Sequence, residues 1–165
     1  MKPFIVGDLI QFPDYPALRL LLPKIDTHGR AVTPNYFAHE ITDHPLMRDF
    51  TARFDVKPFV SFLSRFNGGE ELTLHADDRS MVKLHFPIET DDCSVHFHSS
   101  AVPPSTILAT HLYRREEPVL LDVRVPHSLV NRSKSPKYSL ILAWDSLDLQ
   151  SAARMLRSRP SSARP

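Results

Sequence analysis

Apolar residues recur at helical spacing in the first half of the chain, between residues 42 and 69. The segment TDHPLMRDFTARF predicts a helix that Thr42 or Asp43 caps. Its apolar face comprises Leu46, Met47, Phe50 and Phe54. A second helix is predicted to follow, with Asp55 as its cap and the pair Gly68-Gly69 at its end. Its apolar stripe comprises Phe59, Phe62, Leu63 and Phe66.

After Gly69 the apolar residues alternate with polar ones, which is the period of a half-buried strand. Polar or proline-containing turns separate the predicted strands, which are ELTLHA, SMVKLHFPI, CSVHFHS, STILATHLY, PVLLDVRV and KYSLILAW. So many short strands in succession are typical of a β-sandwich or barrel. The segment DSLDLQSAARMLR then predicts a short helix capped by Asp145 or Ser146.

The chain length fits one domain with its own hydrophobic core, because 165 residues bury most of their unfolded surface. We expect a single domain over residues 1–157. It would consist of an N-terminal segment with supporting helices (1–68), a β core (69–144) and a C-terminal helix (145–157). Prolines break the first forty residues into short pieces that are expected to pack around the core, with PALRLLL as a helical turn or a strand. The basic tail, 158–165, is expected to be disordered.

Charge and composition exclude several classes of function. Twenty basic and nineteen acidic residues give a net charge of +1, so nothing drives the chain toward nucleic acid or an anionic membrane. Four glycines leave no room for a P-loop or a dinucleotide-binding fingerprint. No apolar run reaches the ~18 residues of a membrane span, and the single Cys93 suits a reducing compartment, so we expect a cytoplasmic protein. The oligomeric state is not predicted.

The sequence His75-Ala-Asp77 is the first candidate for chemistry. On an extended strand these two side chains point to the same face and can share one metal ion. A chain with nine histidines also contains such pairs by chance, so the spacing alone leaves a metal site and a pair of surface residues as alternatives. Asp78 would point to the opposite face.

Further residues in a fixed order add to this pair. His127 lies at the predicted end of a later strand, in RVPHSLVNRSKSPKYSLIL, and Lys137 and Ser139 follow it. This order resembles that of the iron(II)- and 2-oxoglutarate-dependent oxygenases, and the likeness covers roughly residues 66–144. The resemblance implies that His75, Asp77 and His127 are the metal ligands and catalytic centre. It also implies that Lys137 and Ser139 bind 2-oxoglutarate. Iron(II) held by two imidazoles and one carboxylate keeps positions open for 2-oxoglutarate and dioxygen.

Within that superfamily, KLHFPIETDD resembles a stretch of the aspartyl/asparaginyl β-hydroxylase branch, which includes bacterial proline hydroxylases. The resemblance implies that His85 contacts the 2-oxoglutarate carboxylate and that Lys83 stands where that branch has arginine. It implies a mainly β fold, a double-stranded β-helix (a cupin-like jelly roll) with supporting N-terminal helices. It also implies hydroxylation of an amino-acid side chain, free or within a peptide or protein.

Three features differ from the family pattern. Lysine at positions 83 and 137 replaces arginine and offers a point charge rather than a bidentate fork, and RREEPVLLDV lacks the usual glycine turn. Arg124 is therefore an alternative anchor for 2-oxoglutarate. His85 has a solvent-facing alternative. Asp122 is expected to hydrogen-bond a turn. Asn131 and Arg132 are expected in a turn, with an inward orientation toward the substrate as the alternative. His96 and His98 are expected on one polar strand face, and at best lie near the metal ligands or the substrate.

Two other functions remain open at this stage. One is a cupin-like metal- or carboxylate-binding module without oxygenase activity, and the other is a barrel that binds a protein partner through its basic tail. The residues Lys137 and Ser139 favour the oxygenase, because a simple metal-binding module needs no anchor for 2-oxoglutarate.

Overall fold

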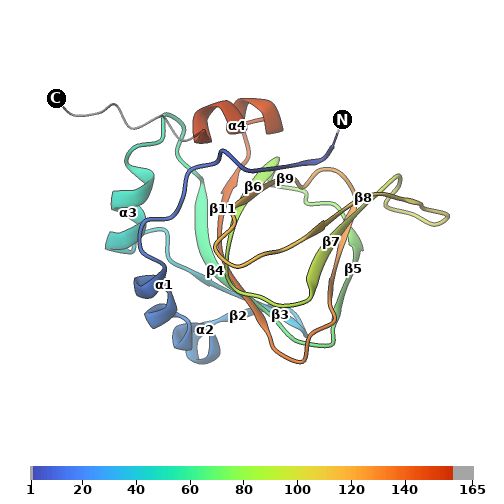
Figure 1. Cartoon of the computed structure of the whole chain (residues 1–165), viewed down its shortest axis with the longest axis horizontal. Helices are drawn as coiled ribbons and strands as arrows, with labels where there is room; N and C mark the ends of the chain where they lie inside the picture. The colour runs from blue at the N-terminus through green and yellow to red at the C-terminus, as the bar shows by residue number, and fades with distance from the viewer. Residues whose placement is uncertain (1, 158–165) are drawn as a thin grey trace.

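Eleven strands form two antiparallel sheets in the computed structural model, which describes residues 2–157. The larger sheet contains, in spatial order, β1 (Phe4–Val6), β9 (Val119–Asp122), β6 (Val82–Glu89), β11 (Lys137–Trp144), β4 (Val60–Phe66), β3 (Tyr36–Glu40) and β2 (Arg30–Thr33). The smaller sheet contains β5 (Glu71–His75), β10 (His127–Asn131), β7 (Cys93–His98) and β8 (Ile107–Leu112). Figure 1 shows the two sheets enclosing a common interior.

The inner faces of the two sheets pack against each other through one hydrophobic cluster. Phe66 and Leu121 of the larger sheet contact this cluster, as do Val95, Phe97 and Leu129 of the smaller one. Alternation along each strand decides which residues join it, since neighbouring side chains point to opposite faces. The inner faces therefore enclose both an apolar core and the candidate site described below.

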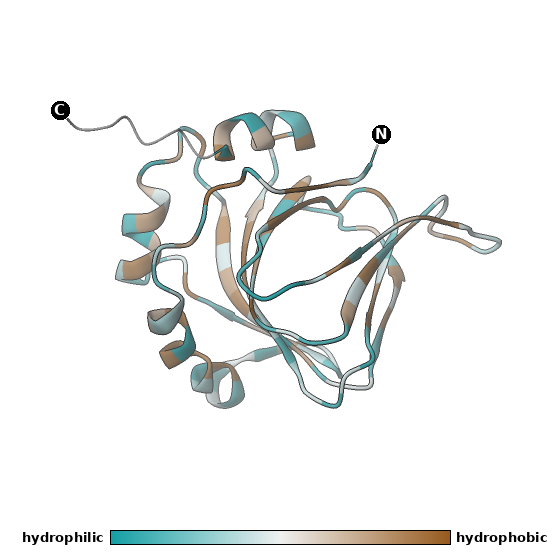
Figure 2. Cartoon of the chain, viewed as in Figure 1, coloured by the Kyte–Doolittle hydropathy of each residue, from teal (hydrophilic) through white to brown (hydrophobic). Residues whose placement is uncertain are grey.

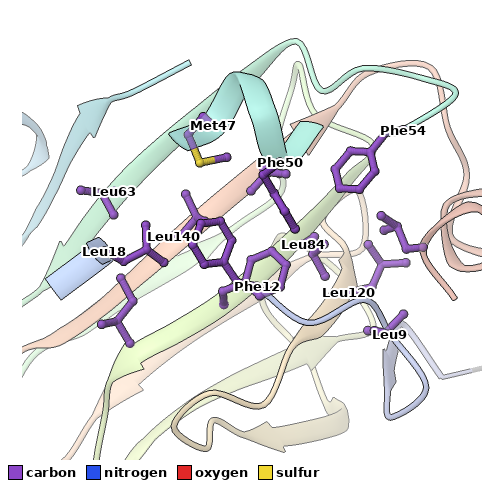
Figure 3. Close-up of a cluster of buried hydrophobic side chains, with 14 of the residues drawn as sticks. Leu9, Phe12, Leu18, Met47, Phe50, Phe54, Leu63, Leu84, Leu120 and Leu140 are labelled. Atoms are coloured by element: carbon purple, nitrogen blue, oxygen red, sulfur yellow. The ribbon is translucent and has the colours of Figure 1, made fainter. Parts of the chain in front are cut away.

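Four helices cover the outer face of the larger sheet: α1 (Tyr15–Leu21), α2 (Pro23–His28), α3 (Pro45–Thr51) and α4 (Leu149–Leu156). Figure 2 shows that the helices carry both hydrophobic and hydrophilic residues, so one side of each can pack while the other meets solvent. The second core lies between these helices and the sheet, and Figure 3 shows part of it around Phe12, Phe50 and Leu84. This layer fixes the sheet on which half of the candidate site is built.

The helix predicted between Asp55 and Gly68 was wrong, because residues 60–66 form the central strand β4. This strand pairs with β11 on one side and with β3 on the other. Both faces of β4 contact apolar cores, so the spacing of its apolar residues fits a helix as well as a strand. Pairing with two neighbouring strands decides the conformation. The Gly68-Gly69 pair ends the strand instead, with Gly69 at φ +72°.

The other predicted elements are largely confirmed, with changes at their ends. The helix α3 is capped by His44 rather than Thr42 or Asp43, and α4 by Asp148 rather than Asp145 or Ser146. PALRLLL lies in and just after α1, and all six predicted strands form. The tail 158–165 lies outside the described residues, and no helix within 2–157 is long and apolar enough to cross a membrane.

Candidate active site

A cavity of about 290 Å³ opens between the two sheets and contains most of the predicted site residues. His75, Asp77 and His127 line it, together with Lys83 and His85. The other residues that line it are Val32, Thr33, Tyr36, Leu72, Thr73, Tyr113, Leu121, Val123, Leu129 and Ile141. The cavity thus combines a few polar groups with a mainly apolar wall, which is the usual composition of a site for a small molecule.

His75 and His127 face each other across the β5–β10 pair, where they are direct partners in register. Their ring centroids lie 4.4 Å apart. Nδ1 of His75 lies 2.7 Å from the carbonyl oxygen of Thr73, and Nδ1 of His127 lies 2.9 Å from that of Val125. A carbonyl oxygen only accepts, so each Nδ1 must carry a proton, and in the neutral form of each ring Nε2 is the nitrogen with the lone pair.

Burial lowers the pKa of His127 to about 4, so its imidazole is neutral at physiological pH. A neutral imidazole whose Nδ1–H donates to a backbone carbonyl is the usual form of a metal-binding histidine, because the hydrogen bond fixes both the tautomer and the ring orientation. His127 therefore has the electronic form that ligation requires, and the Nδ1 hydrogen bond of His75 orients its ring in the same way.

Asp77 lies just beyond the end of β5, and its backbone N–H donates to the carbonyl of Val123 at 3.0 Å. Its carboxylate oxygen Oδ2 has no directed hydrogen bond, but lies 2.7 Å from Nζ of Lys83 in an ion pair. The two side chains are only 21% and 20% exposed. Asp77 thus lines the same cavity as both histidines, while its charge is matched by a lysine.

These residues fit a transition-metal ion in donor type, since they offer two imidazole nitrogens and a carboxylate oxygen. The described chain nevertheless contains no group of three or more His, Cys, Asp or Glu side chains arranged to hold a metal ion. One oxygen of the Asp77 carboxylate, Oδ2, contacts the ammonium group of Lys83.

Lys137 is buried beside the cavity, with 2% of its surface exposed. Its Nζ donates to Oγ of Ser139 at 2.8 Å and lies 4.0 Å from the centroid of the Tyr113 ring. Within residues 2–157 it forms no ion pair with a carboxylate. Burial lowers its pKa to about 8, so a bound anion would both complete its contacts and favour its charged form.

His85 occupies the inner face of β6, opposite Ile141 of β11, and its solvent-facing interpretation was wrong because only 5% of it is exposed. Neither ring nitrogen has a hydrogen-bond partner among the described residues. Burial first, and then the nearby charges of Lys137 and Lys83, hold the pKa of His85 well below its usual range. A neutral imidazole with two unpaired nitrogens is costly to bury, which indicates a site that a polar ligand completes.

Tyr113 is a residue that sequence reasoning missed. Its ring stacks on His85 at a centroid distance of 5.7 Å, and its buried hydroxyl has no hydrogen-bond partner in the described chain. Burial raises its pKa well above the usual range, so the hydroxyl stays a donor. Alternation in STILATHLY puts Tyr113 on the same strand face as His111, but no motif in the sequence indicates a function for Tyr113.

The remaining candidates lie away from the cavity. Arg124 forms an ion pair with Asp122 at 3.0 Å and is not among the cavity residues. The Asn131 side-chain amide donates to the carbonyls of Asn67 and Ser135, which confirms its role in a turn. The polar strand face expected for His96 and His98 is confirmed, since both are partly exposed and contact hydroxyl groups, those of Thr110 and Ser128.

Comparison with known proteins adds information on the fold. No protein-family model matches the chain, and no curated protein matches it. Among solved structures it is similar to SnoK, a non-heme alpha-ketoglutarate-dependent carbocyclase from nogalamycin biosynthesis, with a TM-score of 0.64 and 11% identity over 86% of this chain and 79% of that one.

Two further structures extend the likeness. A 2OG-Fe(II) oxygenase family oxidoreductase from Burkholderia pseudomallei gives a TM-score of 0.54 at 8% identity, covering 81% of this chain and 78% of that one. Vicilin from Corylus avellana (hazelnut) gives 0.50 at 13% identity, covering 72% of this chain and 31% of that one. Sequence identities this low speak for the fold alone. The predicted mainly β, cupin-like jelly roll is therefore confirmed, and its structural neighbours include 2OG-Fe(II) oxygenases.

Proposed function

We propose that this protein is an iron(II)- and 2-oxoglutarate-dependent dioxygenase that hydroxylates an amino-acid side chain, free or within a peptide. One observation carries the proposal: His75 and His127 face each other in the cavity that Asp77 also lines, and each commits Nδ1 to a backbone carbonyl, which leaves Nε2 as the nitrogen that can bind a metal. The buried Lys137, which has no carboxylate partner within residues 2–157, supports the same interpretation. The fold likeness to 2OG-Fe(II) oxygenases agrees with it.

The proposed reaction consumes one dioxygen, one 2-oxoglutarate and one C–H bond, and yields succinate, carbon dioxide and one C–OH group. Iron(II) held by His75, Asp77 and His127 would supply the oxidation chemistry. The residues of the chain bind and orient the iron and 2-oxoglutarate. The Nδ1 hydrogen bonds hold the two imidazoles in place, and Lys137 with Ser139 holds the distal carboxylate of 2-oxoglutarate.

Two cavity residues complete the proposed binding of 2-oxoglutarate. The Tyr113 hydroxyl and one His85 nitrogen are buried donors without partners in the described chain, and a carboxylate accepts from both. The mainly apolar wall lowers the local dielectric constant, which strengthens these contacts. The amino-acid substrate is proposed from the likeness of KLHFPIETDD to the aspartyl/asparaginyl β-hydroxylase branch.

A second candidate function is a cupin-like carboxylate-binding module without oxygenase activity. The Asp77–Lys83 ion pair favours it, because a carboxylate already matched by an ammonium group is a weaker metal ligand. The two candidates differ in one property, since only the oxygenase converts 2-oxoglutarate.

The test is succinate formation by the purified protein with fresh iron(II), ascorbate and a panel of amino acids and peptides. We expect slow succinate release without the true substrate and a faster rate with it. The variant His127→Ala should lose both turnover and iron binding while remaining folded. If the wild-type protein forms no succinate from 2-oxoglutarate with any substrate on the panel, the carboxylate-binding module becomes the better explanation.

A further inference from the structure

The strand β2 forms one edge of the larger sheet and borders the opening of the cavity. It pairs with β3 on one side (Figure 1), and no strand within residues 2–157 pairs with its other side. The pairing with β3 shifts register between Ala31 and Thr33, so two consecutive residues, Val32 and Thr33, both line the cavity. Val32 also has 60% of its surface exposed, which places it at the opening. The free edge of β2 therefore offers unpaired backbone N–H and C=O groups beside the entrance to the site.

The cavity wall around this opening carries no charge. Among the described residues that line the cavity, the charged ones are Asp77 and Lys83, which pair with each other. The three histidines that line it belong to the metal and co-substrate sites proposed above, as does Lys137 beside it. The other cavity residues are apolar or carry a neutral hydroxyl group. Arg30 of β2 and Glu71 of β5 are exposed to solvent and do not line the cavity.

A free amino acid fits this wall poorly. Its ammonium and carboxylate groups lie on the carbon next to the side chain, so they enter the cavity together with the C–H bond that reacts. Neither group finds a free opposite charge on the wall, and burying a charge without a partner is costly. In a peptide both groups are neutral amides, which need only hydrogen-bond partners. The free edge of β2 supplies such partners at the opening.

We infer that the substrate is a peptide segment in extended conformation, which pairs with the free edge of β2 and inserts one neutral, apolar side chain into the cavity. This inference rests on the proposed function and narrows its substrate to peptidyl residues. The cavity of about 290 Å³ lies at the lower end of the ~300–1,000 Å³ of ligand pockets, and 2-oxoglutarate takes part of it. The remaining space suits one side chain, while main-chain pairing at the strand edge supplies affinity. Val32 contacts the peptide at the opening and is a specificity-determining residue.

The first experiment compares three forms of the same residue, for valine, leucine, isoleucine, proline and methionine in turn. These forms are the free amino acid, its N-acetyl amide, and a capped nonapeptide mixture with that residue in the centre and random neighbours. Succinate formation with iron(II) measures turnover. Dialysis against protein loaded with Mn(II) and 2-oxoglutarate, followed by mass spectrometry, measures binding without turnover. We expect at least one nonapeptide mixture to be retained and to yield at least about tenfold more succinate than the corresponding free amino acid.

The second experiment replaces Val32 and uses a matched control on the opposite edge of the same sheet. Val32→Asn keeps a similar size without adding a charge and should weaken the best nonapeptide about tenfold, because an apolar contact is lost. Val32→Ile should retain the wild-type affinity. Val6 of β1 is also an apolar residue on an edge strand, 41% exposed, and does not line the cavity. Val6→Asn should therefore leave peptide binding unchanged, and thermal melts establish that each variant folds.

The third experiment tests the pairing with β2 itself. Only alternate backbone N–H groups of a strand face its partner. Methylating the backbone nitrogens of the best nonapeptide one at a time should therefore weaken binding at every second position near the centre. Equal tolerance of methylation at all positions would overturn the strand pairing.

The outcomes separate this inference from the proposed function. Free amino acids or N-acetyl amides that match the nonapeptides would overturn the inference while leaving the oxygenase intact. The same holds if the wild-type protein converts 2-oxoglutarate slowly by itself but neither retains nor responds to any nonapeptide mixture. Equal losses in Val32→Asn and Val6→Asn would overturn the role of Val32. If the wild-type protein forms no succinate and binds no Mn(II), the proposed function fails and the inference fails with it.

Discussion

Replacing Lys137 by methionine should stabilise the fold and weaken co-substrate binding at the same time. The side chain is 2% exposed and forms no ion pair with a carboxylate in the described chain, so its charge is costly in the unliganded protein. Methionine keeps a similar apolar length and cannot carry a charge. A residue placed there for stability alone would give the opposite result.

The magnitude follows from the pKa of Lys137. A fall from 10.5 to about 8 on burial corresponds to about 3 kcal/mol. Methionine loses the hydrogen bond to Ser139 and the contact with the Tyr113 ring, which together contribute about 1–2 kcal/mol. We therefore expect Lys137→Met to raise the free energy of unfolding by about 1–2 kcal/mol near pH 7.

The pH dependence of this gain has a defined sign. Because the pKa is lower in the folded protein, the unfolded chain binds more protons between about pH 8 and pH 10.5, and wild-type stability rises with pH in that window. The cost of the charge is complete below about pH 8. Urea unfolding of both proteins at about pH 7 and about pH 9.5 should show the advantage of the variant shrinking at the higher pH.

The same variant should bind 2-oxoglutarate about ten- to a hundredfold more weakly, because a charge-assisted contact in a buried site contributes roughly 1.5–3 kcal/mol. Calorimetry on metal-loaded protein measures this loss, and Lys137→Arg should keep much of the affinity if the larger head group fits. Lower stability together with unchanged 2-oxoglutarate affinity in Lys137→Met would refute the reasoning.

Three other substitutions test different parts of the account. His85→Phe should make the protein less sensitive to acid. Because the pKa of His85 is lowered in the folded protein, the unfolded chain takes up the proton first as the pH falls below about 6.5, and the wild type loses stability there. Urea unfolding at acidic pH measures this loss, which the variant should not show. Tyr113→Phe removes a buried hydroxyl without a partner in the described chain, so it should leave the melting temperature unchanged or higher while weakening 2-oxoglutarate severalfold in calorimetry. Leu84→Ala should lower the free energy of unfolding by about 2–5 kcal/mol in a urea titration, since Leu84 is fully buried in the core of Figure 3, and an effect below about 1 kcal/mol would contradict that packing.

Alternation of apolar and polar residues predicted the strands after residue 69. The strands β5, β7 and β8 bury one face more completely than the other, and β6 and β11, although nearly buried on both faces, keep polar residues at alternating positions, such as Lys83 and His85 or Lys137 and Ser139. Alternation failed at β4, where Phe62 and Phe66 face the interior and Leu63 faces the helices. A strand buried on both faces has no clear period, and only its pairing with two neighbours distinguishes it from a helix. The short N-terminal strands β1, β2 and β3 were missed because they contain few residues and lie at or near the sheet edge.

The candidate site was predicted to the extent that strand geometry decides it. Lys137 and Ser139, which the resemblance paired, contact each other because they are two residues apart on one strand, and His75 and His127, which it also paired, are partners in register. The Asp77–Lys83 ion pair was not predicted, because it depends on how the turn after β5 approaches β6. Tyr113 was missed because a tyrosine in an alternating strand looks like any other core residue.

Anaerobic titration of the purified protein with iron(II) and 2-oxoglutarate tests the central claim most directly. The account predicts a weak visible charge-transfer band that appears only when both are present, reaches its limit at one iron per chain, and is absent in His75→Ala and His127→Ala. The account would be contradicted if the protein were folded and saturated with 2-oxoglutarate, yet gave no such band, or gave one that both histidine variants retained.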